Sequence, residues 1–152
     1  MRAPEKSHFV CAVIWRRDER GQIKFLVVDS VSTHPRTGNK SGVNVKFPGG
    51  MNRTGESIEE TFQREVLEET NLSVLSSDAE LIWSFDASRD HTRYAFLIPF
   101  EKCQGALRES VLSDNGDEIQ PPRFEPVGAL VRFMFDGHQP PLVAAMQHLG
   151  LL

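Results

Sequence analysis

The chain has 152 residues, of which 39% are hydrophobic and 25% are charged, and this balance excludes disordered and fibrous proteins. The net charge of −4 argues against a basic groove for a nucleic-acid backbone. It leaves a polyanionic substrate open, because a bound cation can supply the positive charge. We expect a single domain over residues 1–152.

Cysteine usage and the N-terminal pattern indicate the compartment. Cys11 and Cys103 have no C-x-x-C neighbour and are expected to be free thiols in a reducing environment. The apolar run at 8–15 ends in Arg16 and Arg17 without a small-residue cleavage site, so it is typical of a strand and not of a signal peptide. No segment approaches the roughly 20 apolar residues that span a bilayer. The sequence therefore predicts a cytoplasmic protein without a membrane partner.

The first third of the chain has the pattern of strands. Residues 8–16 and 23–30 are rich in β-branched and aromatic side chains and are separated by a turn, which predicts a hairpin. Residues 31–42 are polar with Gly and Pro and form a long loop, and loops of that length are often functional. Residues 43–47 are predicted to form a third strand, which Pro48-Gly49-Gly50 ends.

A helix is predicted at residues 57–70. Ser57 followed by Glu60 forms a capping box, which defines the start of the helix. Asn71 suits the left-handed position just past the end, where Asn is the commonest substitute for Gly.

The remainder of the chain mixes strands, loops and a last helix. Residues 80–85 and 92–100 are predicted strands joined by a polar turn. Residues 103–122 form a second long polar stretch. Residues 123–135 carry both strand and helix signals and leave the element undecided. Residues 140–152 are predicted to form a terminal helix with Pro near its start.

The charges of the predicted helix lie beside its apolar stripe and not opposite it. The stripe consists of Ile58, Phe62 and Val66. Glu65 and Glu69 lie next to it, one turn apart, and Glu68 borders the same sector. Carboxylates gathered at the edge of a core need raised pKa values or a cation, and hard divalent ions prefer oxygen ligands. The alternative is an ordinary acidic helix face in solvent.

Residues 50–72, GMNRTGESIEETFQREVLEETNL, resemble the Nudix box, G-x5-E-x7-R-E-U-x-E-E-x-G-U with U aliphatic. Every specified position agrees except Asn71, where the family has Gly. Asn tolerates a left-handed cap, so we expect a small effect on stability and none on chemistry. Phe47-Pro48-Gly49-Gly50 is also similar to the approach that the family commonly carries. The resemblance implies an α/β Nudix fold, in which a mixed β-sheet is sandwiched between α-helices.

The same resemblance implies a divalent-metal site that takes Mg²⁺, with Mn²⁺ also supporting activity. The implied metal-binding residues are Gly49, Gly50, Glu56, Glu65, Glu68 and Glu69. Glu65 and Glu69 are expected to be direct ligands, and either glycine would contribute a backbone carbonyl. Arg64 would orient the carboxylates without touching substrate.

The implied reaction is in-line attack of water at phosphorus, which metal ions promote by neutralising phosphate oxygens and by lowering the pKa of bound water. A general base is also required. Glu69 or Glu65 can serve, or an acidic residue of a downstream loop, as in many relatives. The candidates there are Asp114, Asp117 and Glu118, with Glu118 the first choice. These three also fit an ordinary solvated turn.

Residues outside the box are expected to select the substrate. Relatives similar to ADP-ribose hydrolases carry Pro, and those similar to dinucleoside polyphosphate hydrolases carry Tyr, in the window that corresponds to Ser84–Arg89; this chain has neither there. Arg36 and Lys40 of the long loop and Arg53 of the box are candidate phosphate contacts, with plain solvent exposure as the alternative. Four aromatic residues alternate along the two later strands, Trp83, Phe85, Tyr94 and Phe96. Core positions are favoured for them over stacking on a base.

The leading hypothesis is a metal-dependent pyrophosphohydrolase acting on a nucleoside diphosphate linked to another moiety. Its partner would be a small nucleotide-type molecule, with a nucleoside triphosphate or an RNA 5′ end also open. The alternative is a non-catalytic Nudix-fold module that senses or binds a nucleotide, although such relatives usually lose box carboxylates and this chain keeps them. A third interpretation is a purely structural acidic helix. The oligomeric state stays open, and a homodimer is compatible with the sequence.

Overall fold

The computed structural model describes residues 6–114 and 116–152. Its strands are β1 Ser7–Arg17, β2 Ile23–Ser32, β3 Asn44–Lys46, β4 Gly49–Met51, β5 Glu80–Ser88, β6 His91–Pro99, β7 Leu112–Asp114, β8 Asp117–Ile119 and β9 Arg123–Pro126. Its helices are α1 Ile58–Thr70, α2 Val127–Phe133 and α3 Gln139–His148, with short 3-10 turns η1 Ser76–Asp78, η2 Phe100–Lys102 and η3 Asp136–His138.

The strands form one mixed sheet with the order β5-β6-β1-β2-β8-β7. β3 and β9 also pair with β2, and β4 pairs with β1. β1 and β6 run parallel, with residues paired from Ser7↔His91 to Trp15↔Pro99, whereas the other pairs are antiparallel. The hairpins predicted from the sequence, β1–β2 and β5–β6, are both present.

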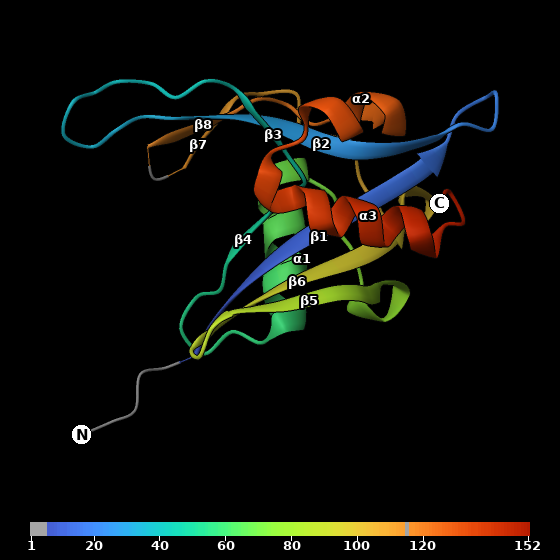
Figure 1. Ribbon diagram of the computed structural model, residues 1–152, viewed down its shortest axis with the longest axis horizontal. Coiled ribbons are helices and arrows are strands. Elements are labelled where there is room, and N and C mark those ends of the chain that lie inside the picture. The colour runs from blue at the N-terminus through green and yellow to red at the C-terminus, as the bar shows by residue number, and fades with distance from the viewer. Residues whose placement is uncertain (1–5, 115) are drawn as a thin grey trace.

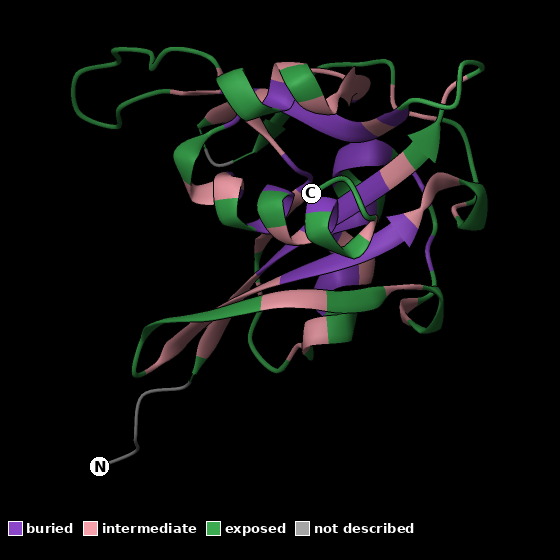
Figure 2. Cartoon of the chain, turned by 45° about the vertical axis from the view of Figure 1, so that its right-hand side comes forward, coloured by how far each residue is buried: buried purple, intermediate pink, exposed green. Residues whose placement is uncertain are grey.

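Helices cover both faces of the sheet, and Figure 1 shows β1 and β6 between α1 on one side and α3 on the other. Successive side chains of β1 point to opposite faces of the sheet, so β1 contributes to the core on both faces. Val10 and Ile14 pack with the apolar stripe of α1, while Cys11 and Val13 pack with side chains of α2 and α3. The buried residues accordingly concentrate in the central strands and in α1, as Figure 2 shows. This is the predicted mixed sheet between helices.

Local signals set both ends of α1. The Ser57 side chain accepts from the Glu60 backbone N–H, and the Glu60 side chain accepts in return from the Ser57 N–H, both at 3.1 Å. Asn71 has φ 67° and ψ 16°, and its N–H donates to the Leu67 carbonyl at 3.0 Å. Its side-chain amide also donates to the Ala106 carbonyl at 3.0 Å. The capping box and the left-handed cap are therefore confirmed.

Several short elements differ from the predictions. Gly49–Met51 forms β4, so Pro48-Gly49-Gly50 does not end strand pairing, and residues 103–122 contain the β7–β8 hairpin. These strands have three residues each, too few for a visible alternation. Residues 123–135 resolve into β9 followed by α2, which explains the mixed signals. The last helix ends at His148, before the end of the predicted range.

The segment between β2 and β3 extends away from the packed layers at one end of β2 (Figure 1). Its residues from 33 to 43 are exposed to solvent. Within the part of the chain that the structure describes, none of the helices has the length and apolar character needed to cross a membrane.

Candidate active site

Two glutamates of α1 meet the short strand β4. Glu65 and Glu69 lie one turn apart on the buried side of the helix, with only 8% and 6% of their surface exposed. Helix spacing places them on the same face, next to Phe62 and Val66, which anchor α1 on the sheet. Two carboxylates are therefore held at the edge of the core, as the sequence predicted.

Glycine is required where β4 approaches these carboxylates. The Gly49 N–H donates to Glu69 Oε2 at 2.9 Å. A Cβ on Gly50 would collide with the Glu65 carboxylate, and one on Gly49 would collide with the backbone of Val10. The two glycines thus allow backbone and carboxylates to approach more closely than any side chain would permit.

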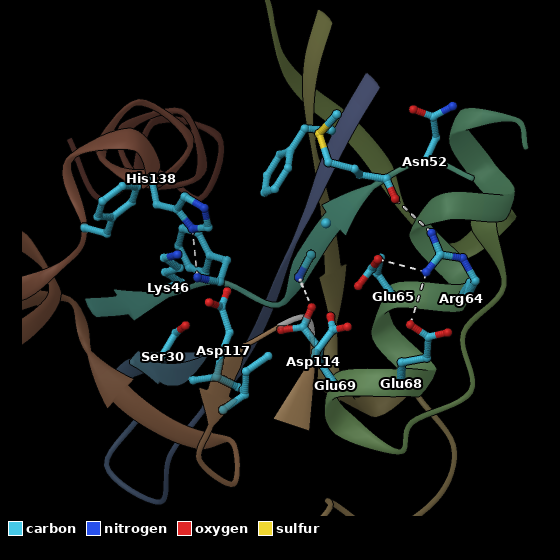
Figure 3. A pocket seen from close by; sticks show the side chains of 18 of the residues that line it. Ser30, Lys46, Asn52, Arg64, Glu65, Glu68, Glu69, Asp114, Asp117 and His138 are labelled. Atoms are coloured by element: carbon cyan, nitrogen blue, oxygen red, sulfur yellow. Dashed lines mark hydrogen bonds and ion pairs between the residues drawn. The ribbon is translucent and has the colours of Figure 1, made fainter. Parts of the chain in front are cut away.

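Arg64 uses its five N–H donors in this region, four on carboxylates and one on the backbone of β4. Nε and Nη2 bind both oxygens of Glu56, at 2.6 and 2.9 Å. Nη1 binds Glu65 at 2.9 Å and Glu68 at 3.1 Å, and Nη2 also reaches the Met51 carbonyl at 2.9 Å. Figure 3 shows this guanidinium between Glu65, Glu68 and the backbone of β4. It fixes α1 against β4.

The carboxylates of this network differ in their affinity for protons. The Arg64 guanidinium lowers the pKa of Glu56 to about 2. Burial raises the pKa of Glu65, and burial together with its contact with Glu65 raises the pKa of Glu69 well above its ordinary value. Glu56 is thus a fixed anion neutralised by arginine, whereas the Glu65–Glu69 pair needs a proton or a further cation.

A cleft of about 490 Å³ opens in front of this pair. Asp114 and Asp117 enter it from the β7–β8 hairpin, and the charge of Asp114 helps to raise the pKa of Glu69. Arg53 lines the same cleft, and its Nη2 binds Glu68 at 2.9 Å. Figure 3 shows Asp114 beside Glu69, and Asp117 farther along the cleft towards Lys46.

Comparison with known proteins identifies the family. A family model described as NUDIX domain matches residues 7–146. The chain belongs to the Nudix family. No curated protein matches the sequence significantly.

Solved structures give the same fold at low sequence identity. A NUDIX hydrolase from Nitrosomonas europaea is 22% identical with a TM-score of 0.64, covering 96% of this chain and 90% of that one. The NUDIX domain of Shewanella oneidensis NrtR, in a cocrystal with ADP ribose, is 20% identical with a TM-score of 0.65, covering 98% and 90%. A MutT structure from a study of Aliivibrio salmonicida and Vibrio cholerae is 18% identical with a TM-score of 0.64, covering 95% and 99%.

Nudix proteins typically use divalent metals, and the residues of this Nudix chain fit such an ion. Among residues 6–114 and 116–152, no three acidic, His or Cys side chains converge into a closed metal cage. Glu65 and Glu69 nevertheless form a buried carboxylate pair, and because burial raises the pKa of both, a cation would stabilise their charged forms. Carboxylate oxygens are the ligands that Mg²⁺ and Mn²⁺ prefer.

Three predicted site residues of the Nudix chain lie elsewhere. Arg36 and Lys40 are exposed on the segment between β2 and β3 and do not line the cleft, so a role in contacting phosphate stays a prediction. Glu118 is exposed and also outside the cleft lining, because side chains alternate along β8 and those of Asp117 and Ile119 face the cleft. The role of Glu118 as general base therefore stays a prediction, and Asp117 is the acidic residue of β8 that lines the cleft.

Glu56, which was expected to complete or support the metal site, is held by Arg64. Both of its oxygens are bound by Arg64, and one of them also accepts from the Thr61 hydroxyl at 2.7 Å. It does not line the cleft. Its hydrogen bonds make it the anchor of Arg64, and the structure gives no support for a direct metal ligand there.

Sequence reasoning missed the far wall of the cleft. The wall includes Phe9, Ser30, Lys46, Arg93, Phe135 and His138. They come from strands and turns far apart in the chain, so no local spacing indicates them. The four aromatic residues considered for base stacking, Trp83, Phe85, Tyr94 and Phe96, are absent from the cleft lining. Phe96 is core, as favoured, whereas Phe85 is 55% exposed.

Arg108 is a further residue without a local signal. Its Nε donates to the backbone carbonyl of Glu69 at 2.8 Å, and its Nη2 donates to the carbonyl of Gln120 at 3.0 Å. It also donates to the carbonyl of Ser110. The end of α1 that carries Glu69 is thereby tied to the end of β8 and the residue after it, so Arg108 positions the two halves of the site relative to each other.

Proposed function

We propose that this chain is a divalent-metal-dependent hydrolase that cleaves the pyrophosphate bond of a nucleoside diphosphate linked to another moiety. The observation that carries the proposal is the buried Glu65–Glu69 pair at the glycine approach of β4, open to a cleft. Family membership and the nucleotide-type ligand of the Shewanella relative support it.

The proposed metal ligands are Glu65 and Glu69, with Glu68 and the backbone of Gly49 or Gly50 contributing to the site. When bound, Mg²⁺ or Mn²⁺ supplies charge neutralisation at the phosphate oxygens and lowers the pKa of water for in-line attack. Arg64 holds Glu65 and Glu68 in orientation, and the Gly49 N–H fixes one oxygen of Glu69. This fixed arrangement limits the reorganisation needed during the reaction.

A proton must leave the attacking water. We propose Asp114 as its acceptor, since this carboxylate lines the cleft and lies close enough to Glu69 for their charges to interact. Asp117 lines the same cleft from the other end of the hairpin turn and is the second candidate. Both replace Glu118, whose side chain does not line the cleft.

The competing function is a Nudix-fold module that binds a nucleotide without turnover. The box carboxylates favour the enzyme, because a sensor has no need for a buried pair of like charges. Changing Glu69→Gln separates the two functions. An enzyme loses turnover, whereas a metal-independent sensor keeps its ligand affinity.

The direct test is a hydrolysis screen of the purified chain with Mg²⁺ over nucleoside diphosphate derivatives, nucleoside triphosphates, dinucleoside polyphosphates and 5′-triphosphorylated RNA. We expect metal-dependent release of a nucleoside monophosphate from at least one diphosphate derivative, with ¹⁸O from labelled water found in a phosphate product. Glu59→Gln, an exposed change on the same helix, is the matched control and should leave turnover unchanged. If no compound is turned over with Mg²⁺ or with Mn²⁺, the proposal is refuted.

A further inference from the structure

The cleft has two chemically different ends. One end holds the carboxylates of α1 and Asp114, and Asp117 lies between this end and the opposite one. At the opposite end, Figure 3 shows Lys46, His138 and Ser30 around the same opening. Phe9, Phe135 and Arg93 complete that wall. We call His138, Lys46 and Arg93 together the distal site.

His138 presents a fixed hydrogen-bond donor to the cleft. Its side chain is buried, with 2% of the residue exposed, and Nδ1 accepts from the Phe47 backbone N–H at 2.9 Å. Phe47 also stacks on the ring, at an interplanar angle of 14°. Burial lowers the pKa of His138 to about 3, so the ring is neutral at pH 7 and its one proton must sit on Nε2.

That donor has no partner among the residues that the structure describes. In residues 6–114 and 116–152, Nε2 of His138 makes no hydrogen bond, and it is not among the atoms sealed from solvent without a partner. His138 lines the cleft. The Nε2–H group is therefore available to an acceptor that enters the cleft.

Two cations flank this donor. Lys46 Nζ lies 4.9 Å from the centroid of the Phe135 ring, and the Arg93 guanidinium lies 5.3 Å from the centroid of the Phe9 ring. Both charges contribute to the low pKa of His138, so the field at the ring is positive. Throughout the described ranges, neither cation has a carboxylate within 4.0 Å, although Asp117 lies in the same cleft.

These contacts favour an anion over a stacked base at the distal site. The aromatic rings that would sandwich a base, Phe9 and Phe135, each already carry a cation over one face. The three side chains of the distal site offer only hydrogen-bond donors to the cleft. Their formal charge is +2, from Lys46 and Arg93. A phosphate monoester, with a charge of about −1.5 to −2 at pH 7 and several acceptor oxygens, matches both properties.

We propose that the distal site binds a second phosphate group of the substrate, a monoester carried on the ribose of the nucleoside whose diphosphate is cleaved. The inference rests on the proposed function, because it assumes that the diphosphate occupies the Glu65–Glu69 end. It defines the substrate class as nucleoside diphosphate derivatives that carry an additional phosphate monoester.

The test compares equilibrium binding of adenosine 5′-monophosphate with that of adenosine 2′,5′- and 3′,5′-bisphosphate, by calorimetry in the presence of Mg²⁺. We expect at least one bisphosphate to bind about 10-fold or more tightly than the monophosphate, the difference that charge-assisted hydrogen bonds supply. Lys46→Met should remove most of this preference while keeping the aliphatic contact with Phe135. Lys24→Met removes a lysine outside the cleft and should leave the preference intact.

A second variant tests the Nε2–H donor of His138. His138→Asn keeps an oxygen acceptor for the Phe47 N–H but removes the Nε2–H donor, so it should also reduce the preference for the bisphosphate. The proposal is overturned when no bisphosphate binds more tightly than the monophosphate, or when Lys46→Met weakens both ligand classes equally. Because binding is measured without turnover, an absence of hydrolysis in the substrate screen leaves this readout intact, and the two failures are distinguishable.

Discussion

At the scale of single residues, the site depends on carboxylates that lie close together but have different partners. Glu56 is saturated by Arg64, while Glu65 and Glu69 are buried against each other with too little positive charge. Burial increases the repulsion between like charges, because the effective dielectric constant is lower there. The metal-free protein is therefore destabilised at neutral pH by the same pair that would hold the ion.

The substitution Glu69→Gln tests whether this pair destabilises the metal-free protein. The amide oxygen can still accept from the Gly49 N–H, but the buried charge is gone. We expect the free energy of unfolding of the metal-free protein at pH 7 to rise by about 1 kcal/mol, while Mg²⁺-dependent turnover is lost. Urea unfolding with EDTA measures the first effect, and Glu59→Gln serves as the exposed control. A loss of stability in the metal-free variant would contradict the account.

Site residues could be predicted from the sequence where their spacing along the helix determines their position. The Glu65–Glu69 pair and the orienting role of Arg64 follow from helical periodicity. The pairing of Glu56 with Arg64 could not be predicted, because it depends on a tertiary contact. The direction of the Glu118 side chain could not be predicted either, because it depends on the register of a three-residue strand. His138 had no recognisable spacing, since its partner Phe47 is far away in the sequence.

At the scale of elements, α1 owes its position to its two ends and to the glycines of β4. The capping box and the left-handed Asn71 were predictable because each depends on residues within one turn. The β7–β8 hairpin was not, because its short strands are defined by pairing with β2 and not by their own pattern.

The cap can be tested with two changes at one position. Asn71→Ala and Asn71→Gly both remove the amide hydrogen bond to Ala106, so their difference isolates the cost of the left-handed backbone. We expect the Ala variant to be less stable than the Gly variant by about 1 kcal/mol in thermal or urea unfolding. Both should keep the chemistry of the site. Equal stabilities would show that the conformation at Asn71 does not limit the helix.

The segment between β2 and β3 gives a second test at this scale. Arg36 and Lys40 lie outside the cleft, whereas Arg53 lines it and binds Glu68. We expect the double change Arg36→Ala and Lys40→Ala to alter kcat/KM by no more than about twofold, since exposed substitutions away from a site have small effects. Arg53→Ala should reduce kcat/KM by a larger factor. A large effect of the double change would mean that this segment closes over the substrate.

At the scale of the whole molecule, the sheet brings together residues that lie far apart in the chain. β3 supplies Lys46, β6 supplies Arg93, and the segment after α2 supplies His138, all at one cleft. The overall layering was predictable from the resemblance and from alternating apolar strands. The composition of the far wall was not, because it depends on how several elements meet.

Buried His138 makes the stability of the folded protein depend on pH. The unfolded chain takes up this proton near the ordinary pKa of 6.5, whereas the folded protein does so only near 3. Between these values the unfolded state binds more protons, so this group's contribution to stability is present above pH 6.5 and is lost as the pH falls toward 3. The loss is on the order of 5 kcal/mol over the whole window.

The measurement is the free energy of unfolding across this window for the wild type and for His138→Asn. Glu65 and Glu69 contribute the opposite slope, but they do so in both proteins, so the difference between the two curves isolates the histidine. We expect the wild type to lose stability more steeply on acidification. Parallel curves would mean that His138 is protonated in the folded protein near its ordinary pKa.

The central claim is that Glu65 and Glu69 form a binding site for a divalent cation, and a Mn²⁺ titration followed by electron paramagnetic resonance tests it most directly. The account predicts that the wild type and Glu59→Gln bind Mn²⁺ alike, and that Glu69→Gln binds it at least about 10-fold more weakly, as expected when a carboxylate ligand is lost. Mn²⁺ affinity unchanged by Glu69→Gln, or no Mn²⁺ binding by the wild type, would contradict it.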